Sequence, residues 1–71
     1  MKTIITQADQ NIMLARINSG MSRIEFAEKC GVGLSVVANI ESGAAISQRS
    51  AAKVAKALNA RVEDIFEITT K

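Results

Sequence analysis

Apolar residues recur every three or four positions along most of the chain, which is the pattern of short amphipathic helices. The apolar runs are separated by residues that favour the backbone conformations found at helix ends, namely Gly20, Gly31, Gly43 and Asn59. Thr6 and Asp9 have the spacing of a cap at the start of the first run. The pattern predicts an all-α fold, a compact bundle of about five short helices over 7–18, 22–30, 33–42, 47–58 and 62–66.

The inward-facing positions of these helices define the predicted core. In the second helix, Ile24 and Phe26 are expected to face the same apolar side. The predicted core comprises Ile12, Ala15, Phe26, Ala27, Cys30, Val32, Val37, Ile40, Ile46, Val54, Leu58, Ile65 and Phe66.

The two ends of the chain, residues 1–5 and 67–71, differ from the rest because they are rich in β-branched residues. Such residues favour extended backbone. The simpler interpretation is that both ends are frayed. The alternative is that they pair as strands, either within one chain or across a dimer.

Residues 22–43 contain the most informative local pattern. Ser22 and Glu25 have the spacing of a capping box at the start of one helix. Gly31 then allows the chain to reverse direction before a second helix that Gly43 ends. Two helices joined by a short turn containing Gly form a helix-turn-helix, whose second helix enters the major groove of DNA.

Composition narrows the classes of function. The chain has 71 residues, which predicts a single domain over 1–71. It contains no histidine and one cysteine, Cys30, so no catalytic residues, metal site or cofactor are predicted and the chain is not expected to be an enzyme. Its apolar runs are too short to span a bilayer, and a cytoplasmic protein without a membrane partner is expected. The net charge of +2 is only mildly basic.

The chain resembles the helix-turn-helix family of Cro and the phage repressors. The residues that match the family pattern in the motif are Ser22, Glu25, Phe26, Ala27, Gly31, Val32, Ile40, Glu41 and Gly43. Outside the motif, the matching residues are Arg16, Ala55, Ala57, Leu58 and the segment 62–66. The resemblance covers roughly residues 6–66 and implies a small Cro-like transcriptional repressor of a phage, prophage or other mobile element that binds double-stranded DNA.

The resemblance also implies which residues meet DNA. The outward face of the recognition helix would comprise Gly33, Leu34, Ser35, Ala38, Asn39 and Ser42. Phosphate contacts would come from Arg23, Gln48 and Arg49, with Lys2 and Lys53 as further candidates. In this family, the positions of Arg16 and Glu41 form a partly buried ion pair that orients the recognition helix.

The sequence suggests two partners other than DNA. A homodimer is expected because one recognition helix reads only a few base pairs. Its surface would use the end of the chain, through Val62, Ile65, Phe66 and Ile68, or else the N-terminal strand. The alternative function is that of an antirepressor or inhibitor that binds a partner regulator protein. It is motivated by the weak net charge and by the apolar residues Leu34, Val36 and Ala38 in the recognition helix.

Overall fold

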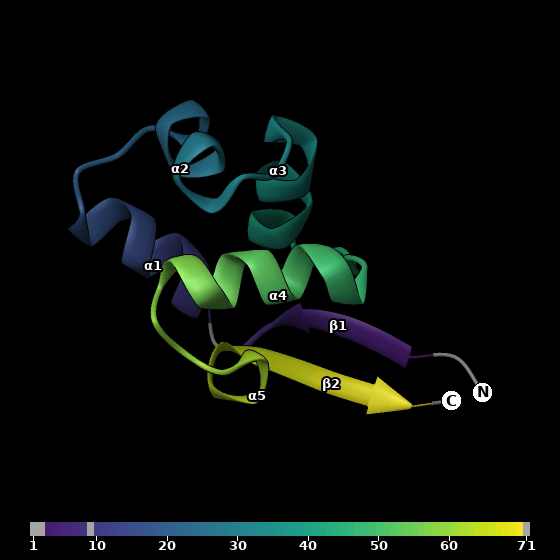
Figure 1. Ribbon diagram of the computed structural model, residues 1–71. Helices are drawn as coiled ribbons and strands as arrows, with labels where there is room; N and C mark the ends of the chain where they lie inside the picture. The colour runs from purple at the N-terminus through teal and green to yellow at the C-terminus, as the bar shows by residue number, and fades with distance from the viewer. Residues whose placement is uncertain (1–2, 9, 71) are drawn as a thin grey trace.

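A computed structural model describes residues 3–8 and 10–70 of the chain. Five short helices lie above and beside a two-stranded sheet, with α4 over the sheet and α2 and α3 at the far side (Figure 1). In chain order, the elements are β1 (Thr3–Gln7), α1 (Asn11–Asn18), α2 (Arg23–Cys30), α3 (Leu34–Ser42), α4 (Gln48–Ala57), α5 (Val62–Ile65) and β2 (Phe66–Thr70). The predicted helical bundle with a central helix-turn-helix is confirmed.

The two ends of the chain pair with each other as antiparallel strands. Ile5 lies opposite Ile68, and Gln7 lies opposite Phe66. On its other side, β1 accepts a hydrogen bond at the Ile5 carbonyl from the amide of Ile46, at 3.0 Å. The interpretation as frayed ends is therefore wrong, and pairing within one chain is what the structure shows. The strands span 3–7 and 66–70, slightly different from the predicted 1–5 and 67–71.

The start of the first helix was predicted wrongly. Residue 7 belongs to β1, and α1 begins only at Asn11. The pairing of β1 with the end of the chain explains the late start of α1. The Ala8 amide still donates to the Ile65 carbonyl at 3.1 Å, which keeps the chain extended past Gln7. The backbone then turns at Gln10, whose φ is 60°. Asp9, the other half of the predicted cap, lies outside the described residues.

The helix ends predicted at Ser22, Gly31 and Gly43 are confirmed, whereas Phe66, predicted in the last helix, is the first residue of β2 because it pairs with Gln7. The Ser22 hydroxyl accepts from the Glu25 amide at 3.2 Å, and the Glu25 carboxylate accepts from the Ser22 amide at 2.9 Å. This is a complete capping box. Gly31 and Gly43 take left-handed conformations, with φ of 72° and 86°, which end α2 and α3.

The core lies where the helices meet the inner face of the sheet. Its largest fully buried side chains are Phe26, Ile12, Ile40, Val37 and Val54, all of them predicted. Ile5, Ala51 and Ala55 are also buried but were absent from the predicted core, whereas Ala15, Val32, Ile46, Leu58 and Ile65 are only partly buried.

Ile24 corrects the expected apolar side of α2. Its side chain is 58% exposed, although Phe26, Ala27 and Cys30 are buried. At 3.6 residues per turn, Ile24 lies roughly 110° from the centre of the arc that those three residues define. It therefore points away from the core and towards solvent.

We predict that Ile5→Ala lowers the free energy of unfolding by about 2–4 kcal/mol, because it removes a buried side chain and leaves a cavity. Ile5 is 3% exposed and joins both strands to the helices. Ile17→Ala is the control, since Ile17 is 53% exposed and should change stability by less than about 0.5 kcal/mol. Urea denaturation measures both values. Equal costs would contradict a structural role for the N-terminal strand.

Candidate functional site

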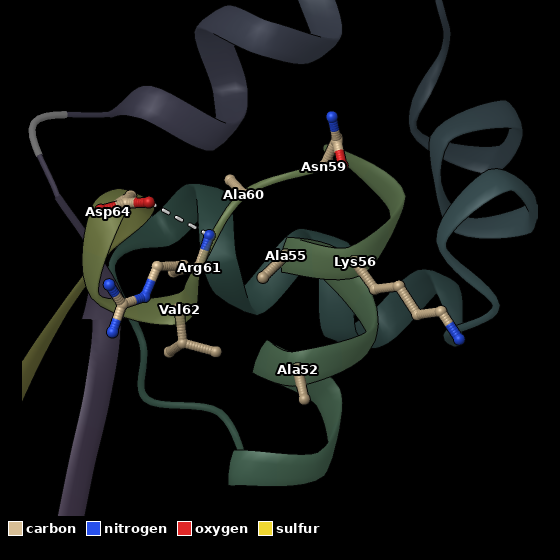
Figure 2. Close-up of a pocket in the computed structure, with 8 residues that line it drawn as sticks. All are labelled: Ala52, Ala55, Lys56, Asn59, Ala60, Arg61, Val62 and Asp64. Atoms are coloured by element: carbon tan, nitrogen blue, oxygen red, sulfur yellow. Dashed lines mark hydrogen bonds between the residues drawn. The ribbon is translucent and has the colours of Figure 1, made fainter.

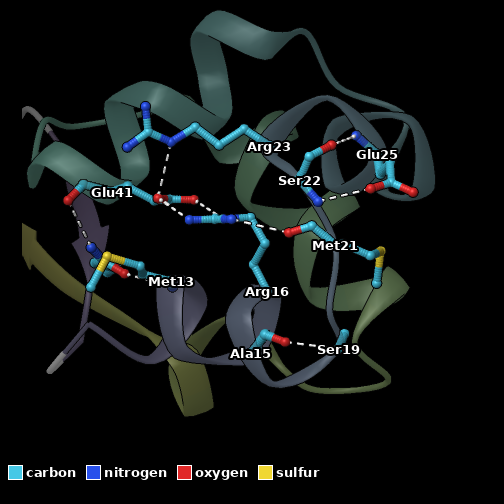
Figure 3. A network of polar contacts seen from close by, with 10 residues as sticks. Met13, Ala15, Arg16, Ser19, Met21, Ser22, Arg23, Glu25 and Glu41 are labelled. Carbon is cyan, nitrogen blue, oxygen red and sulfur yellow. Dashed lines mark hydrogen bonds and ion pairs between the residues drawn. The ribbon is translucent and has the colours of Figure 1, made fainter.

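A cluster of three charged side chains holds the helix-turn-helix in place (Figure 3). Arg16 of α1 binds Glu41 of α3 through two hydrogen bonds, from Nε to Oε2 at 2.6 Å and from Nη2 to Oε1 at 3.0 Å. Arg23, the first residue of α2, donates its Nε to Glu41 Oε1 at 3.2 Å. The pair between Arg16 and Glu41 that the resemblance implied is present, and Arg23 joins it.

The carboxylate in this cluster is buried, whereas its partners reach solvent to different degrees. The Glu41 side chain is 2% exposed, compared with 16% for Arg16 and 55% for Arg23. Burial by itself would raise the pKa of Glu41, but the hydrogen bonds from the two guanidinium groups outweigh it and the pKa is lowered. The carboxylate therefore stabilises the fold above its ordinary pKa of 4.5, and this contribution is lost as the pH falls through the lowered value.

Backbone contacts extend the cluster to β1 and to the start of the motif. Arg16 Nη1 donates to the Met21 carbonyl at 3.0 Å, which fixes the chain just before α2. Gln7 Nε2 donates to the Glu41 backbone carbonyl at 3.3 Å, and Gln7 Oε1 accepts from the Met13 amide at 3.3 Å. This role of Gln7 was not predicted from the sequence, because it depends on the position of β1 and not on any motif.

The outward side of α3 carries the residues that the family resemblance selected. Leu34, Ser35, Asn39 and Ser42 are exposed, and Ala38 is partly exposed. Val37 and Ile40 point into the core, so these two sets lie on opposite sides of one helix. Gly33 precedes the helix and has no side chain, so no side-chain cap hydrogen-bonds the first amides of α3.

The residues predicted to contact phosphates lie at the starts of α2 and α4. Arg23 opens α2, and Gln48 and Arg49 open α4, where all three are exposed. A helix start favours anions because its amides point outward. Lys53 is exposed further along α4, whereas Lys2 lies outside the described residues.

An open groove of about 520 Å³ runs between the start of α2 and the outward side of α3. Ile24 and Leu34, which are 58% and 47% exposed, are the large apolar side chains that line it. The residues that line the groove are Arg16, Ser22, Arg23, Ile24, Leu34 and Ala38. The helical angle of Ile24 would have indicated its outward position, but its apolar character suggested the core.

A second groove, of about 550 Å³, lies between α4 and the loop before α5 (Figure 2). Val62 lines it together with small side chains such as Ala52 and Ala55. Of the other residues predicted for a dimer surface, Ile65 is partly buried and Ile68 is 48% exposed. Phe66 is 2% exposed, so its side chain belongs to the core and offers no surface to a second copy.

No group of three or more His, Cys, Asp or Glu side chains within residues 3–8 and 10–70 is placed to hold a metal ion. In the same part of the chain, no helix combines the length and apolar character needed to cross a membrane. Cys30 is buried against the core, and burial raises the pKa of its thiol.

A family model described as helix-turn-helix matches residues 12–65, which is more than half of the chain. The match spans α1 to α5 and confirms the resemblance to the family of Cro and the phage repressors. Comparison with curated proteins and with solved structures gives no match.

We predict that Glu41→Ala lowers the free energy of unfolding by about 3 kcal/mol, at the low end for breaking a buried ion pair, because the arginines left behind keep some access to water. The neighbouring Ser42→Ala is the control. Its hydroxyl is exposed and donates only to the Asn39 carbonyl, at 3.0 Å, so its loss should cost less than about 1 kcal/mol. Thermal and urea denaturation of the two variants check this, and equal midpoints would argue against the charged cluster as a structural element.

Proposed function

The chain belongs to the helix-turn-helix family of DNA-binding regulators, and we propose that it is a Cro-like repressor, encoded by a phage, prophage or other mobile element, that binds specific duplex DNA sites as a homodimer. The observation that carries the proposal is the exposed side of α3. Its outward residues contribute little to the core, while the contacts of Glu41 with Arg16 and Arg23 attach the helix to α1 and α2. A helix that is held rigidly and exposed on one side suits the major groove.

Base recognition would come from three kinds of side chain on α3. Asn39 can pair with adenine through two hydrogen bonds, Ser35 can donate or accept, and Leu34 can contact a thymine methyl group. All three are exposed. Gly33 and Ser42 lie at the two ends of this side, where the backbone can approach the phosphates.

Phosphate contacts would flank the recognition helix on both sides. Arg23 at the start of α2 and Arg49 at the start of α4 each combine a cationic side chain with outward backbone amides. Arg23 already binds Glu41 at 3.2 Å, yet its side chain is 55% exposed and retains donors for a phosphate. Gln48 adds an uncharged donor beside Arg49.

The homodimer would form along the outer edge of β2. Because the Ile5 carbonyl accepts from Ile46, it points away from β2, so Ile5 and Ile68 form a pair without mutual hydrogen bonds. In such a pair both residues direct their backbone groups outward, and those of Ile68 face the edge that carries no third strand within the described residues. The strand contains one charged residue, Glu67, and no proline, so little in its sequence opposes pairing.

A second copy of β2 meeting the first in antiparallel fashion would create a four-stranded sheet with a two-fold axis. Val62 and Ile68 line one shallow depression beside this edge together with the charged residues Arg61 and Glu63, so the interface there would combine apolar and polar contacts. The N-terminal strand is less suited to the interface, because its own outer side already pairs with Ile46. The two-fold axis would present two recognition helices to the two halves of a palindromic site.

A second candidate function is binding to another regulator protein. The exposed side chains of Ile24 and Leu34 favour it, because neighbouring apolar groups on a surface often mark a protein interface. Salt distinguishes the two functions. Binding through several phosphates weakens steeply as salt rises, whereas an apolar protein contact does not.

We predict that Arg23→Ala and Arg49→Ala each weaken DNA binding and reduce the slope of log affinity against log salt by about one unit, because each removes one phosphate contact. Lys56→Ala, which removes an exposed charge in the last turn of α4, should leave the slope unchanged. Fluorescence anisotropy with random and genomic duplexes, at low and near-physiological salt, measures affinity and slope. Wild-type binding that vanishes with salt on every duplex would contradict the proposed function, and unchanged slopes in both arginine variants would remove these phosphate contacts.

We predict that Ile68→Glu weakens the homodimer by at least about tenfold, because it places a charge at the centre of the proposed interface. Asn18→Glu introduces the same charge at an exposed position at the end of α1 and should leave the dimer intact. Sedimentation velocity over a range of concentrations gives the monomer–dimer equilibrium. A wild-type chain that stays monomeric, or equal constants for the two variants, would place the interface elsewhere or exclude the dimer.

A further inference from the structure

The groove between α2 and α3 has an apolar floor in an unusual position for a surface that meets DNA. Ile24 is 58% exposed and Leu34 is 47% exposed, and both line the same groove with Ala38. Isolated apolar side chains on a surface need no explanation, but two large ones facing one groove do. None of these three side chains can donate or accept a hydrogen bond.

Two arginine side chains flank this apolar surface. Arg16 and Arg23 line the groove, and the Glu41 carboxylate that both contact balances only one of their two positive charges. Arg23 is also more than half exposed. The groove therefore suits an occupant that has an apolar group next to a negative charge.

Duplex DNA presents such a combination in its major groove. The 5-methyl group is the one apolar group that the base edges expose there, and the phosphates run along the rim of the groove. Leu34 and Ala38 belong both to the outward side of α3 and to the groove wall, so the groove is continuous with the proposed DNA-binding surface. When α3 lies in the major groove, Ile24 of α2 forms the opposite apolar wall.

We propose that Ile24, Leu34 and Ala38 together bind the 5-methyl group of a pyrimidine, in thymine or 5-methylcytosine, at one position of each half-site. This inference rests on the proposed DNA binding and adds its specificity. Selection at that position depends on shape and apolar contact, because these side chains carry no polar atoms. Arg23 anchors the adjacent phosphate, which fixes the depth at which the methyl group enters.

The test removes one methyl group at a time from the DNA. A tight-binding duplex is selected from a random library, and each thymine is replaced in turn by deoxyuridine, which lacks only the methyl group. We expect about 3- to 10-fold weaker binding at one thymine of each half-site, from the loss of one buried methyl contact. At that position, comparing cytosine with 5-methylcytosine shows whether the groove accepts both sources of the methyl group.

Two protein variants assign the effect to the groove. In Ile24→Ala and in Leu34→Ala, the difference between thymine and deoxyuridine should shrink to less than about 2-fold, because each variant removes one of the two large apolar side chains that contact the methyl group. Leu14→Ala is the matched control, since Leu14 is 47% exposed on α1 and should leave the difference intact. All three side chains are exposed, so circular dichroism should show unchanged folding.

The outcomes separate this inference from the proposed function. Tight, salt-resistant DNA binding with no sensitivity to deoxyuridine at any position would overturn the methyl site and leave DNA recognition standing. Sensitivity that persists in both groove variants would also overturn it. If no duplex is bound near physiological salt, both proposals fail and the groove is left as a surface for a protein partner.

Discussion

Glu41 lies near the end of α3, and its buried carboxylate accepts hydrogen bonds from Arg16 of α1 and Arg23 of α2. Burying a carboxylate is costly unless its charge is matched and its oxygens are hydrogen-bonded. Both oxygens are used, and the hydrogen bonds from the two guanidinium groups lower the pKa of Glu41, which favours its charged form in the fold. Because three helices meet at this one group, their relative orientation is fixed by directional contacts as well as by apolar packing.

The same cluster links the stability of the chain to the surface that it presents. Val37 and Ile40 hold α3 from the core side, and Glu41 holds it from the side of α1 and α2. The opposite side is left with Leu34, Ser35 and Asn39 in solvent. A small domain has few buried contacts with which to position such a helix. The paired strands add to these contacts. Ile5 of β1 and Phe66 of β2 are buried in the core, and Gln7 connects β1 to the Glu41 backbone.

The sequence predicted features that depend on short spacings or on the family pattern, but it did not predict those that depend on contacts with distant parts of the chain. The capping box at Ser22, the glycine turn at Gly31 and the partnership of Arg16 with Glu41 depend on short spacings or on the family pattern, and the sequence predicted them. The course of β1 as far as Gln7 depends on strand partners 59–67 positions away, so no local pattern contains it. Ile24 was placed inward because apolar character was weighted above helical angle, and its exposure on the α3 side is what suggested the methyl site.

In the proposed complex, α3 and the starts of α2 and α4 form one surface for duplex DNA. Nuclear magnetic resonance can locate this surface through the backbone amide shifts of the isotope-labelled chain during titration with a duplex near physiological salt. We expect the largest changes in residues 22–24, 33–42 and 48–49, with small changes in the outer part of β2. Absence of change on every duplex, or changes concentrated in α5 and β2, would contradict it.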